Sequence, residues 1–212
     1  MSEPDPPTDW DERFSSGSYP RDPEPSPVLC EYEPSIPDGR ALDLATGTGR
    51  NAVFLAESGY DVDALDASRE GLRITRERAE EREVDDRLET IHADATEYDF
   101  PTAEYDLITV SFYHTLDRFA DLAAALVDGG YLFVEGHFRS VEATPSGPST
   151  DRYRFAANEL LRAGTALSVR YYDETTQERP NDRGRATARL LACRSHDPRG
   201  PYPERPGGKV RD

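Results

Sequence analysis

Three carboxylates stand at or near the ends of three successive apolar stretches, and two glycines follow the first of them. Asp43 lies inside "LDLA", Asp66 ends "YDVDALD" and Asp94 ends "LETIHAD", while Gly47 and Gly49 come directly after the first stretch. The carboxyl ends of parallel strands meet at one edge of a sheet, where ligands bind. Because glycine lets the backbone approach a ligand closely, this spacing predicts a ligand site at that edge.

The carboxylates indicate the kind of ligand. Asp43, inside an apolar strand, is costly unless it meets a cation or hydrogen-bond donors. Asp66 can accept hydrogen bonds from two ribose hydroxyls, and Asp94 from an adenine amino group, with the Ala95 N–H as a nearby donor. A ligand that bears an ammonium and a sulfonium would favour Asp43, whereas a pyrophosphate would be repelled by it.

Two other interpretations of these residues remain open. Gly-x-Gly-x-x-Ala with Asp66 nineteen positions after Gly47 also satisfies the dinucleotide fingerprint, so a nicotinamide cofactor is an alternative. The glycines could equally form a turn without a ligand, and Asp66 could cap the helix that follows. The agreement of order and spacing at four places favours a ligand site.

"LDLATGTGRNAVFLAESGYDVDALDAS" together with "HADA" resembles the class I S-adenosylmethionine-dependent methyltransferases. The "GxGRN…LA…GYDV" pattern is most similar to the tellurite-resistance and thiopurine-type small-molecule branch, and "WDERFSSGSY" resembles the aromatic N-terminal segment of that branch. The resemblance covers about residues 10–195 and is strongest over 40–112. Thr46 stands where many relatives carry cysteine, a difference that backbone contacts to the ligand should tolerate.

The resemblance implies S-adenosyl-L-methionine as cofactor and a role for each matching residue. Asp43 and the turn from Gly47 to Gly49 would hold the methionine part, Asp66 the ribose, and Asp94 with Ala95 the adenine. Ser111 would end the strand that faces the sulfonium. The other cofactor-binding residues that it implies are Ala45, Thr46, Asn51 and Ala67, and Arg50 and Asn51 would begin the helix after the turn. No metal is expected.

The acceptor decides what further chemistry is needed. Methyl transfer from a sulfonium is an in-line displacement, which depends mostly on positioning. A thiolate or a chalcogen oxyanion needs no enzymic base, whereas a hydroxyl or an amine does. The candidate catalytic residues are His114 and His137, although either could be an ordinary cap or loop histidine. Tyr113, next to His114, and Glu135, two residues before His137, are further candidates for a base, and His92 is expected to pack in the core.

Substrate or lid residues come from two other places. Trp10 and Tyr19, in an aromatic segment that also holds Phe14, could fold over the cofactor or simply pack against the domain. Tyr113 follows the fourth strand. Arg139, with Arg152 and Arg154 farther along, could bind an anionic acceptor, and surface ion pairing is the alternative.

Strands alternating with helices predict a Rossmann-like, doubly wound α/β fold. We expect a mostly parallel seven-stranded sheet with an antiparallel C-terminal strand pair. Residues 1–38 form an irregular N-terminal arm with a possible lid helix, 39–195 the methyltransferase domain and 196–212 a tail. The expected strands are 40–45, 60–66, 88–94, 105–112, 130–138, 165–174 and 186–195, and the expected helices are 50–59, 68–84, 117–127 and 155–164.

The composition restricts the partners. The 212 residues carry a formal net charge of -17, from 42 acidic and 25 basic residues, and Lys209 is the only lysine. This pattern is typical of a halophile, where salt screens self-repulsion, although an ordinary acidic protein is the alternative. Such charge disfavours nucleic acid and anionic membranes. With no signal peptide or membrane span visible, the chain is expected to be cytoplasmic, as a monomer or homodimer.

The sequence therefore predicts a methyltransferase that uses S-adenosylmethionine to methylate a small molecule, such as a thiol or a chalcogen oxyanion. A protein that binds S-adenosylmethionine without catalysis is one alternative. An NAD-dependent oxidoreductase is a second, and Asp43 argues against it.

Overall fold

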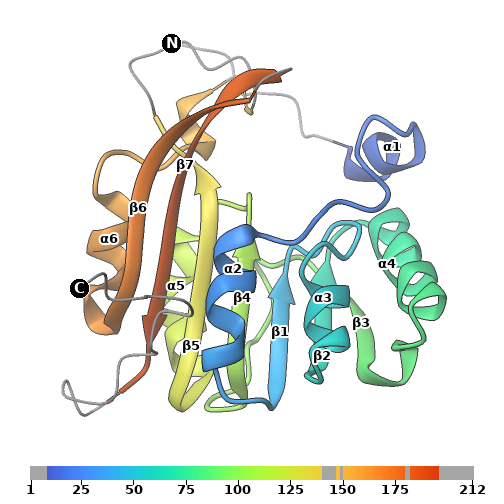
Figure 1. Ribbon diagram of the computed structural model, residues 1–212, viewed down its shortest axis with the longest axis horizontal. Helices are drawn as coiled ribbons and strands as arrows, with labels where there is room; N and C mark the ends of the chain where they lie inside the picture. Colours follow the sequence, from blue (N-terminus) through green and yellow to red (C-terminus); the bar gives the residue numbers. More distant parts are fainter. Residues whose placement is uncertain (1–8, 140–146, 149, 180–181, 196–212) are drawn as a thin grey trace, which may run out of the picture.

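A seven-stranded sheet forms the centre of the computed structural model, which describes residues 9–139, 147–148, 150–179 and 182–195 (Figure 1). The strand order is β3-β2-β1-β4-β5-β7-β6. Strands β1 to β5 pair in parallel, and β7 pairs antiparallel with both β5 and β6, which confirms the predicted fold class. The predicted tail 196–212 lies outside the described residues. The strands are β1 (Arg40–Leu44), β2 (Asp61–Asp66), β3 (Leu88–His92), β4 (Tyr105–Ser111), β5 (Leu126–His137), β6 (Ser168–Arg179) and β7 (Asp182–Cys193).

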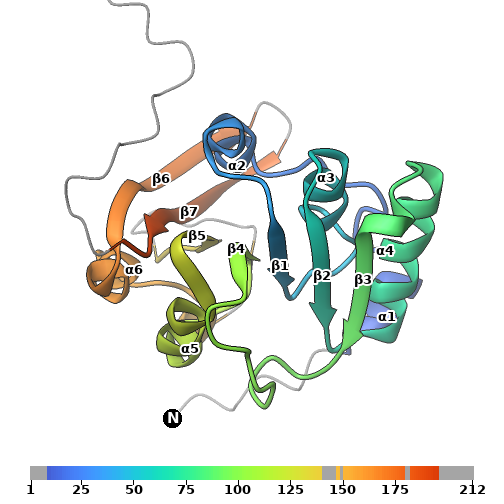
Figure 2. The ribbon, with the colours of Figure 1, turned by 90° about the horizontal axis from the view of Figure 1, so that it is seen from below.

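Helices cover both faces of the sheet (Figure 2). Buried side chains of α2 and α3 join one apolar cluster, and those of α5 and α6 join a second cluster on the opposite face. The α-helices are α1 (Trp10–Ser15), α2 (Pro27–Tyr32), α3 (Ala52–Glu57), α4 (Arg69–Glu81), α5 (Phe119–Ala125) and α6 (Glu159–Ala163), and the short 3-10 helices are η1 (Glu33–Ser35), η2 (Asp85–Arg87), η3 (Leu116–Arg118), η4 (Asp151–Tyr153) and η5 (Gly164–Ala166).

Strand β1 shows why the sheet is covered on both sides. Ala41 belongs to the cluster with α2 and α3, whereas Leu42 and Leu44 belong to the cluster with α5. All three side chains are fully buried. A strand that buries both of its faces reads as a continuous apolar run, and this run is interrupted by Asp43.

The N-terminal arm is less irregular than we expected. Helix α2 begins at Pro27, a residue suited to the first turn of a helix, and buries Val28, Leu29 and Tyr32 in the cluster on that face of the sheet. The prolines and acidic residues around it hide this short apolar helix in the sequence. Residues 27–32 therefore belong to the folded core.

Several element ends differ from the prediction because tertiary pairing determines them. Strand β5 begins at Leu126 rather than 130, since Gly129 and Gly130 exchange backbone hydrogen bonds with Arg194 beyond β7. Helix α6 begins at Glu159 rather than 155, because Phe155 forms a β-bridge with Phe138.

The last two strands, β6 and β7, are each longer than the apolar runs that predicted them. The expectation for His92 was wrong. This residue ends β3 with an exposed side chain, and one ring nitrogen lies 3.0 Å from the carbonyl oxygen of Ala67.

The strand order reverses between β1 and β4, and the chain leaves the two strands at the same edge. In Figure 1, α1 lies above this edge, next to the N-terminal end of α4. Such a switch point is where ligands bind in open α/β sheets. The fold thus brings the predicted site residues to one place and sets the N-terminal arm beside them.

We expect Gly49→Ala to destabilise the fold more than Gly59→Ala. Both glycines have positive φ, +78° and +105°, so alanine costs about 1–2 kcal/mol at either position. At Gly49 the new Cβ would also lie 2.8 Å from Cγ2 of Thr75, whereas nothing lies within 4 Å at Gly59. This clash should add about 1–3 kcal/mol. Urea unfolding measures the difference, and equal losses would contradict the packing found at Gly49.

Candidate functional site

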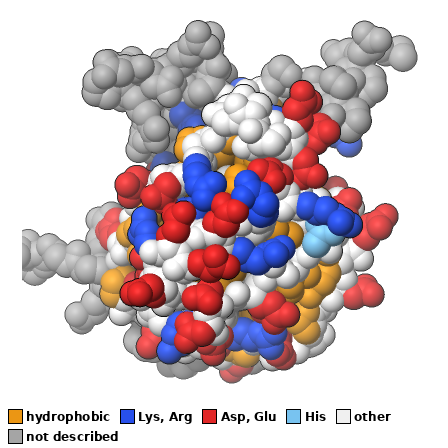
Figure 3. Space-filling view, turned by 90° about the vertical axis from the view of Figure 1, so that its right-hand side faces the viewer, with side chains coloured by type: hydrophobic (Ala, Val, Ile, Leu, Met, Phe, Trp, Pro, Cys, Tyr) orange, Lys and Arg blue, Asp and Glu red, His pale blue; other side chains and the backbone are white. Residues whose placement is uncertain are grey.

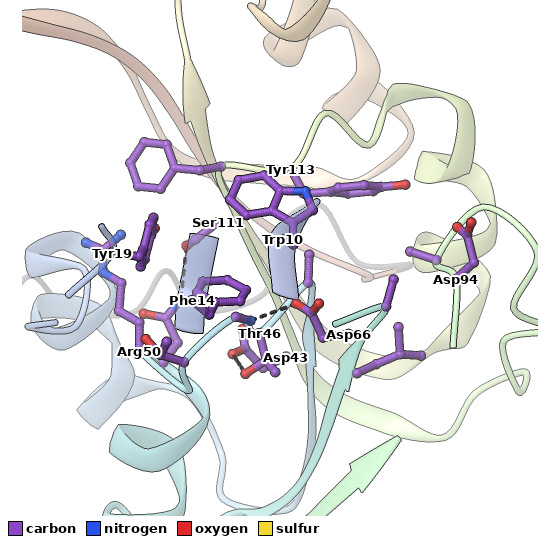
Figure 4. Close-up of a pocket in the computed structure, with 18 residues that line it drawn as sticks. Trp10, Phe14, Tyr19, Asp43, Thr46, Arg50, Asp66, Asp94, Ser111 and Tyr113 are labelled. Atoms are coloured by element: carbon purple, nitrogen blue, oxygen red, sulfur yellow. Dashed lines mark hydrogen bonds between the residues drawn. The ribbon is translucent and has the colours of Figure 1, made fainter. Parts of the chain in front are cut away.

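A cavity that is partly open to solvent lies at the carboxyl ends of β1, β2 and β4 (Figure 4). Concave sites at this edge of an open α/β sheet are where small-molecule ligands bind. The lining residues come from α1 and the segment after it, the glycine turn, and the loops after β2, β3 and β4. They are Trp10, Phe14, Tyr19, Asp43, Ala45, Thr46, Gly47, Thr48, Arg50, Asn51, Leu65, Asp66, Ala67, Asp94, Ala95, Ser111, Phe112 and Tyr113.

The cavity brings together most of the predicted site residues. All the predicted cofactor-binding residues except Gly49 line it, as do the predicted lid residues Trp10, Tyr19 and Tyr113. Gly49, His114, His137 and Arg139 do not. The lining residues that the sequence did not assign to the site are Phe14, Thr48, Leu65 and Phe112, together with Arg50, which was placed only at the start of a helix.

Asp43 is buried and accepts three hydrogen bonds from the chain itself. Thr109 donates its hydroxyl to Oδ1 at 2.6 Å, and Oδ2 accepts from the Thr46 hydroxyl at 2.6 Å and from the Ala52 N–H at 3.2 Å. The side chain is 2% exposed, and its burial raises the pKa to about 6. Asp43 therefore joins β4, the glycine turn and the start of α3.

Asp66 lies in the middle of the cavity, below Trp10 (Figure 4). Its Oδ2 accepts from the Gly47 N–H at 2.8 Å and its Oδ1 from the Ser68 N–H at 2.7 Å. Burial raises the pKa of this carboxyl, and the two backbone donors oppose that shift. A carboxylate oxygen has two lone pairs, so both oxygens can still accept a ligand hydroxyl.

Asp94 lies at the far end of the cavity from Tyr19 and Arg50 (Figure 4). Its Oδ1 accepts from the N–H and the hydroxyl of Thr96, at 2.8 and 2.7 Å, and these bonds lower the pKa of the carboxyl. The side chain is exposed and its second oxygen is available to a ligand. Beside it, Ala95 is buried at the cavity wall.

The glycine turn has an unusual backbone. Ala45, Gly47 and Gly49 all have positive φ, of 56°, 58° and 78°, which is strained for the alanine. The turn is tied to the second strand by a hydrogen bond from the Thr46 N–H to the carbonyl oxygen of Leu65. Backbone strain of this kind concentrates at functional sites.

The segment after residue 8 is held over the cavity by polar contacts with α4. Asp11 accepts from the Ser68 hydroxyl at 2.5 Å and from the Glu70 N–H at 2.9 Å, which places its carboxylate at the N-terminus of α4. Asp22 pairs with Arg78. Thr48 in the glycine turn donates its hydroxyl to the carbonyl oxygen of Pro20 at 3.2 Å. These contacts cover the cavity with the arm.

Aromatic rings form much of the cavity wall. Phe14 stacks against Trp10 with ring centroids 5.7 Å apart and meets Tyr19 edge to face at 5.3 Å. Phe112 has a φ of +58°, and its N–H donates to the carbonyl oxygen of Glu135 at 2.7 Å. We expected Phe112 to end the fourth strand, but β4 ends at Ser111 and the strained Phe112 lines the cavity.

The two predicted catalytic histidines lie away from the cavity wall. The His114 ring stacks on Phe155 with centroids 5.0 Å apart, and burial lowers its pKa. The His137 ring packs against Phe112 at 4.9 Å. Burial, with Arg185 and Arg154 nearby, lowers the pKa of His137 to about 4. Within the described residues its Nδ1 has no hydrogen-bond partner.

The predicted arginines also lie outside the cavity wall. Arg139 donates to the carbonyl oxygen of Asp151 at 3.1 and 3.3 Å. Arg152 lies over the ring of Tyr153. Arg154 donates to the carbonyl oxygen of Phe138. Among the described residues, the contacts given above join these arginines to neighbouring parts of the chain and not to the cavity.

The acceptor groups of the cavity suit a flat polar ligand that carries hydrogen-bond donors and a positive charge. Asp66 and Asp94 offer carboxylate oxygens at the middle and far end of the cavity, and Asp43 places negative charge below the turn. Aromatic faces attract cations as well as apolar groups. Asp43, close to the end where a pyrophosphate would lie, makes the site a poor one for a dinucleotide.

Residues 41–130 match the model of a family described as a methyltransferase domain. Among curated relatives, the chain is 45% identical over 73 residues to a demethylmenaquinone methyltransferase of Clavibacter sepedonicus, an alignment that covers 34% of this chain and 29% of the relative. It is 30% identical over 154 residues to a ubiquinone/menaquinone biosynthesis C-methyltransferase of Pseudomonas fluorescens, which covers 67% of this chain and 59% of the relative.

The curated relatives are longer than the matched part. The first three alignments span between 29% and 39% of the relatives' lengths. Among solved structures, the fold is similar to that of TehB from Haemophilus influenzae, with a TM-score of 0.72 at 20% identity, over 88% of this chain and 67% of that one. At this identity the likeness concerns the fold. None of the helices in the described residues is long and apolar enough to cross a bilayer.

We expect the free energy of unfolding of Asp43→Asn, relative to that of the wild type, to increase as the pH rises from acid to neutral. The folded-state pKa of about 6 lies above the ordinary value of 3.8, so the wild-type Asp43 contributes most below pH 4. That contribution is lost as the pH rises through 6, by about 3 kcal/mol. The asparagine does not titrate. Its oxygen can accept from Thr46 and Ala52, and its NH2 group can donate to the Thr109 hydroxyl, which then acts as the acceptor.

The measurement is the free energy of unfolding of both proteins between pH 4.5 and 8. Other carboxyls titrate in both and cancel. The difference, variant minus wild type, should rise with pH in that interval. A difference that does not change with pH would contradict the assignment of a raised pKa to Asp43.

Proposed function

We propose that this chain is a class I, S-adenosylmethionine-dependent methyltransferase that transfers a methyl group from S-adenosylmethionine to a small-molecule acceptor, a proposal that the match of residues 41–130 to a methyltransferase domain supports. The observation that supports this most is the joint position of Asp43, Asp66 and Asp94 along one cavity. S-adenosylmethionine supplies an electrophilic methyl group on a sulfonium. The protein's own contribution is to bind and orient the two reactants and to exclude water.

The residues that line the cavity suggest how the cofactor would be held. Asp66 accepts hydrogen bonds from the ribose hydroxyls, and Asp94 with the Ala95 N–H recognises the adenine. The methionine part lies along the turn of Ala45, Thr46 and Gly47, near Asn51 and above Asp43. Ala67 lies beside the ribose, and Ser111 faces the sulfonium. Gly49 acts indirectly, by letting the turn pack against α4.

The cavity wall favours an acceptor that needs no enzymic base. Among its described lining residues, Asp43 is bonded to three donors from the chain, Asp66 and Asp94 are the residues proposed to hold the cofactor, and no histidine is present. Tyr113 is a poor candidate for the base, because burial raises the pKa of its hydroxyl and keeps it protonated at neutral pH. A thiolate or a chalcogen oxyanion reacts without deprotonation by the protein. This supports the tellurite-resistance and thiopurine-type branch, with Trp10, Tyr19 and Tyr113 around the acceptor.

A quinol is the second candidate acceptor. Aromatic side chains, among them Trp10, Tyr19 and Phe112, give the cavity flat apolar walls that suit an aromatic ring. The curated relatives reported above are named as quinone-pathway methyltransferases. Methylation of a quinol on a ring carbon forms a C–C bond and releases the proton of that carbon, and loss of a hydroxyl proton would activate the ring for it. No histidine stands among the described lining residues to take either proton.

We also propose that the protein works in a high-salt cytoplasm, without a nucleic acid or membrane partner. The net charge of -17 would be screened there. On the face that carries α4, basic and acidic side chains alternate (Figure 3), as in the ion pairs of Arg73 with Glu70 and Glu77. Such exposed pairs contribute little individually and relieve repulsion locally.

The first test is calorimetric titration with S-adenosylhomocysteine and, separately, NAD(H) in molar potassium chloride. We expect the first to bind and the second not to bind. Turnover of thiols, of selenium or tellurium oxyanions, or of a soluble quinol would then identify the acceptor class. Binding without turnover of any acceptor would favour a non-catalytic binding protein, and binding of NAD(H) alone would favour an oxidoreductase.

We expect Asp66→Ala to weaken S-adenosylhomocysteine binding by about 10- to 100-fold, because hydrogen bonds to a charged group are lost. Asp61→Ala is the matched control: it lies at the other end of β2, exposed and away from the cavity. This control should bind as tightly as the wild type. Unchanged affinity in Asp66→Ala would remove the ribose role from this residue.

We expect His114→Asn and His137→Asn to change kcat/KM only a few-fold, because neither ring lines the cavity. Loss of a general base would lower the rate by about 10²–10⁴-fold. The assay is initial-rate methylation with the best acceptor from the screen. A fall of that size in either variant would restore that histidine as the catalytic base.

A further inference from the structure

Glu135 is a buried carboxylate near the end of β5 that connects three distant parts of the chain. Its side chain is 2% exposed and accepts hydrogen bonds from Ser26 at 2.9 Å, Arg50 at 2.9 Å and Arg189 at 2.8 Å. These donors come from the N-terminal arm, the glycine turn and β7. Glu135 does not line the cavity, and its two cationic partners lower the pKa of its carboxyl against the effect of burial.

Two N-cap residues near Glu135 make hydrogen bonds to other parts of the chain instead of capping their own helices. Ser26 and Asn51 are the N-cap residues of α2 and α3, and neither side chain caps its helix. Ser26 instead donates to Glu135. Asn51 accepts from the Ser26 N–H at 3.4 Å and donates to the Ser111 hydroxyl at the cavity wall at 3.0 Å. An N-cap side chain that bonds elsewhere forgoes about 1 kcal/mol of helix stability.

Arg50 is the link between Glu135 and the cavity. Its Nη1 is bound to Glu135, and its Nε donates to the carbonyl oxygen of Glu24 at 2.7 Å. The guanidinium also lies over the Phe112 ring, 5.5 Å from its centroid. Within the described part of the chain, no acceptor is found for Nη2. Arg50 is the one cationic side chain among the described lining residues, at the opposite end from Asp94 (Figure 4).

We propose that Glu135 is a positioning residue that fixes the Arg50 guanidinium at the cavity wall, so that Nη2 of Arg50 binds an anionic group of the ligand. Two ligands could supply that group. One is the carboxylate of the cofactor's methionine part, and the other is an anionic acceptor. The inference rests on the proposed function, which supplies both.

Glu135 would strengthen ligand binding because it holds the long, flexible side chain of Arg50 in one orientation before the ligand binds. Glu135 and the Glu24 carbonyl fix two of the three guanidinium nitrogens, and the Phe112 ring supports the plane. Preorganisation reduces the entropy lost on binding. The same carboxylate holds Ser26, so the arm that covers the cavity and the cation that faces the ligand share one anchor.

The test compares S-adenosylhomocysteine with 5′-methylthioadenosine, which lacks the amino-acid part, by calorimetry in molar potassium chloride. If the group is the cofactor carboxylate, Glu135→Gln and Arg50→Gln should each weaken S-adenosylhomocysteine binding by at least about tenfold. Binding of 5′-methylthioadenosine should stay within about twofold of wild type, since this ligand does not reach Arg50. If Glu135→Gln does not fold, Arg50→Gln carries the test, because its side chain is partly exposed.

A second titration tests whether the anionic group that Arg50 binds belongs to the acceptor. If the group belongs to the acceptor, selenite should bind the wild-type protein loaded with S-adenosylhomocysteine and should fail to bind the loaded Arg50→Gln variant. Either of these two results supports the inference and identifies the source of the anion. If neither titration distinguishes the variants from wild type, or if both nucleoside ligands lose affinity equally, the inference is overturned.

Asp63→Asn is the matched control. Asp63 is another buried carboxylate, which accepts from Arg40 at 3.0 Å and from the Tyr105 hydroxyl at 2.8 Å and does not line the cavity. Its variant should lose stability without changing the ratio of the two affinities. A wild-type protein that binds no S-adenosylhomocysteine would overturn the proposed function, which is a different outcome from equal binding by wild type and variants.

Discussion

The arrangement of the site depends on one buried carboxylate in the middle of the sheet. Asp43 interrupts the apolar run of β1, and the chain compensates with the hydroxyls of Thr46 and Thr109 and the N–H of Ala52. These bonds hold the glycine turn between β4 and α3. Gly47 then reaches Asp66 on the neighbouring strand, and Arg50 reaches Glu135 on β5. The residues that surround the ligand are therefore positioned by charges that do not all touch it.

The balance of these charges differs along the cavity. At one end Asp43 carries a raised pKa because burial dominates, and its partners are neutral. Glu135, which is equally buried, has a lowered pKa because Arg50 and Arg189 outweigh the effect of burial. Asp43, which has no cationic partner, and Glu135, which has two, thus both bind residues of the glycine turn. This contrast suits a zwitterionic group, which presents an ammonium to one and a carboxylate to the other through Arg50.

Much of the fold could be predicted from the sequence, because apolar runs that alternate with charged helices leave few topologies. The cavity residues at the strand ends were equally predictable, since Asp43 lies near the end of β1, Asp66 ends β2 and Asp94 comes two residues after β3. Phe112 and the supporting role of Glu135 could not be predicted, because they depend on a strained backbone and on contacts between segments far apart in the chain. Helix α2 was missed because its three buried side chains lie among prolines. His114 and His137 follow the right strands, yet their rings pack on Phe155 and Phe112 instead of facing the cavity.

The position of α2 has a consequence for how ligands exchange. Because α2 is part of the core, the segment of residues 9–25 above the cavity is tethered at its C-terminal end and held along its length by Asp11, Pro20 and Asp22. This segment covers one side of the cavity, and its polar contacts therefore add to the barrier that a ligand beneath it meets on leaving. Ions that weaken those contacts would shorten the residence time of such a ligand.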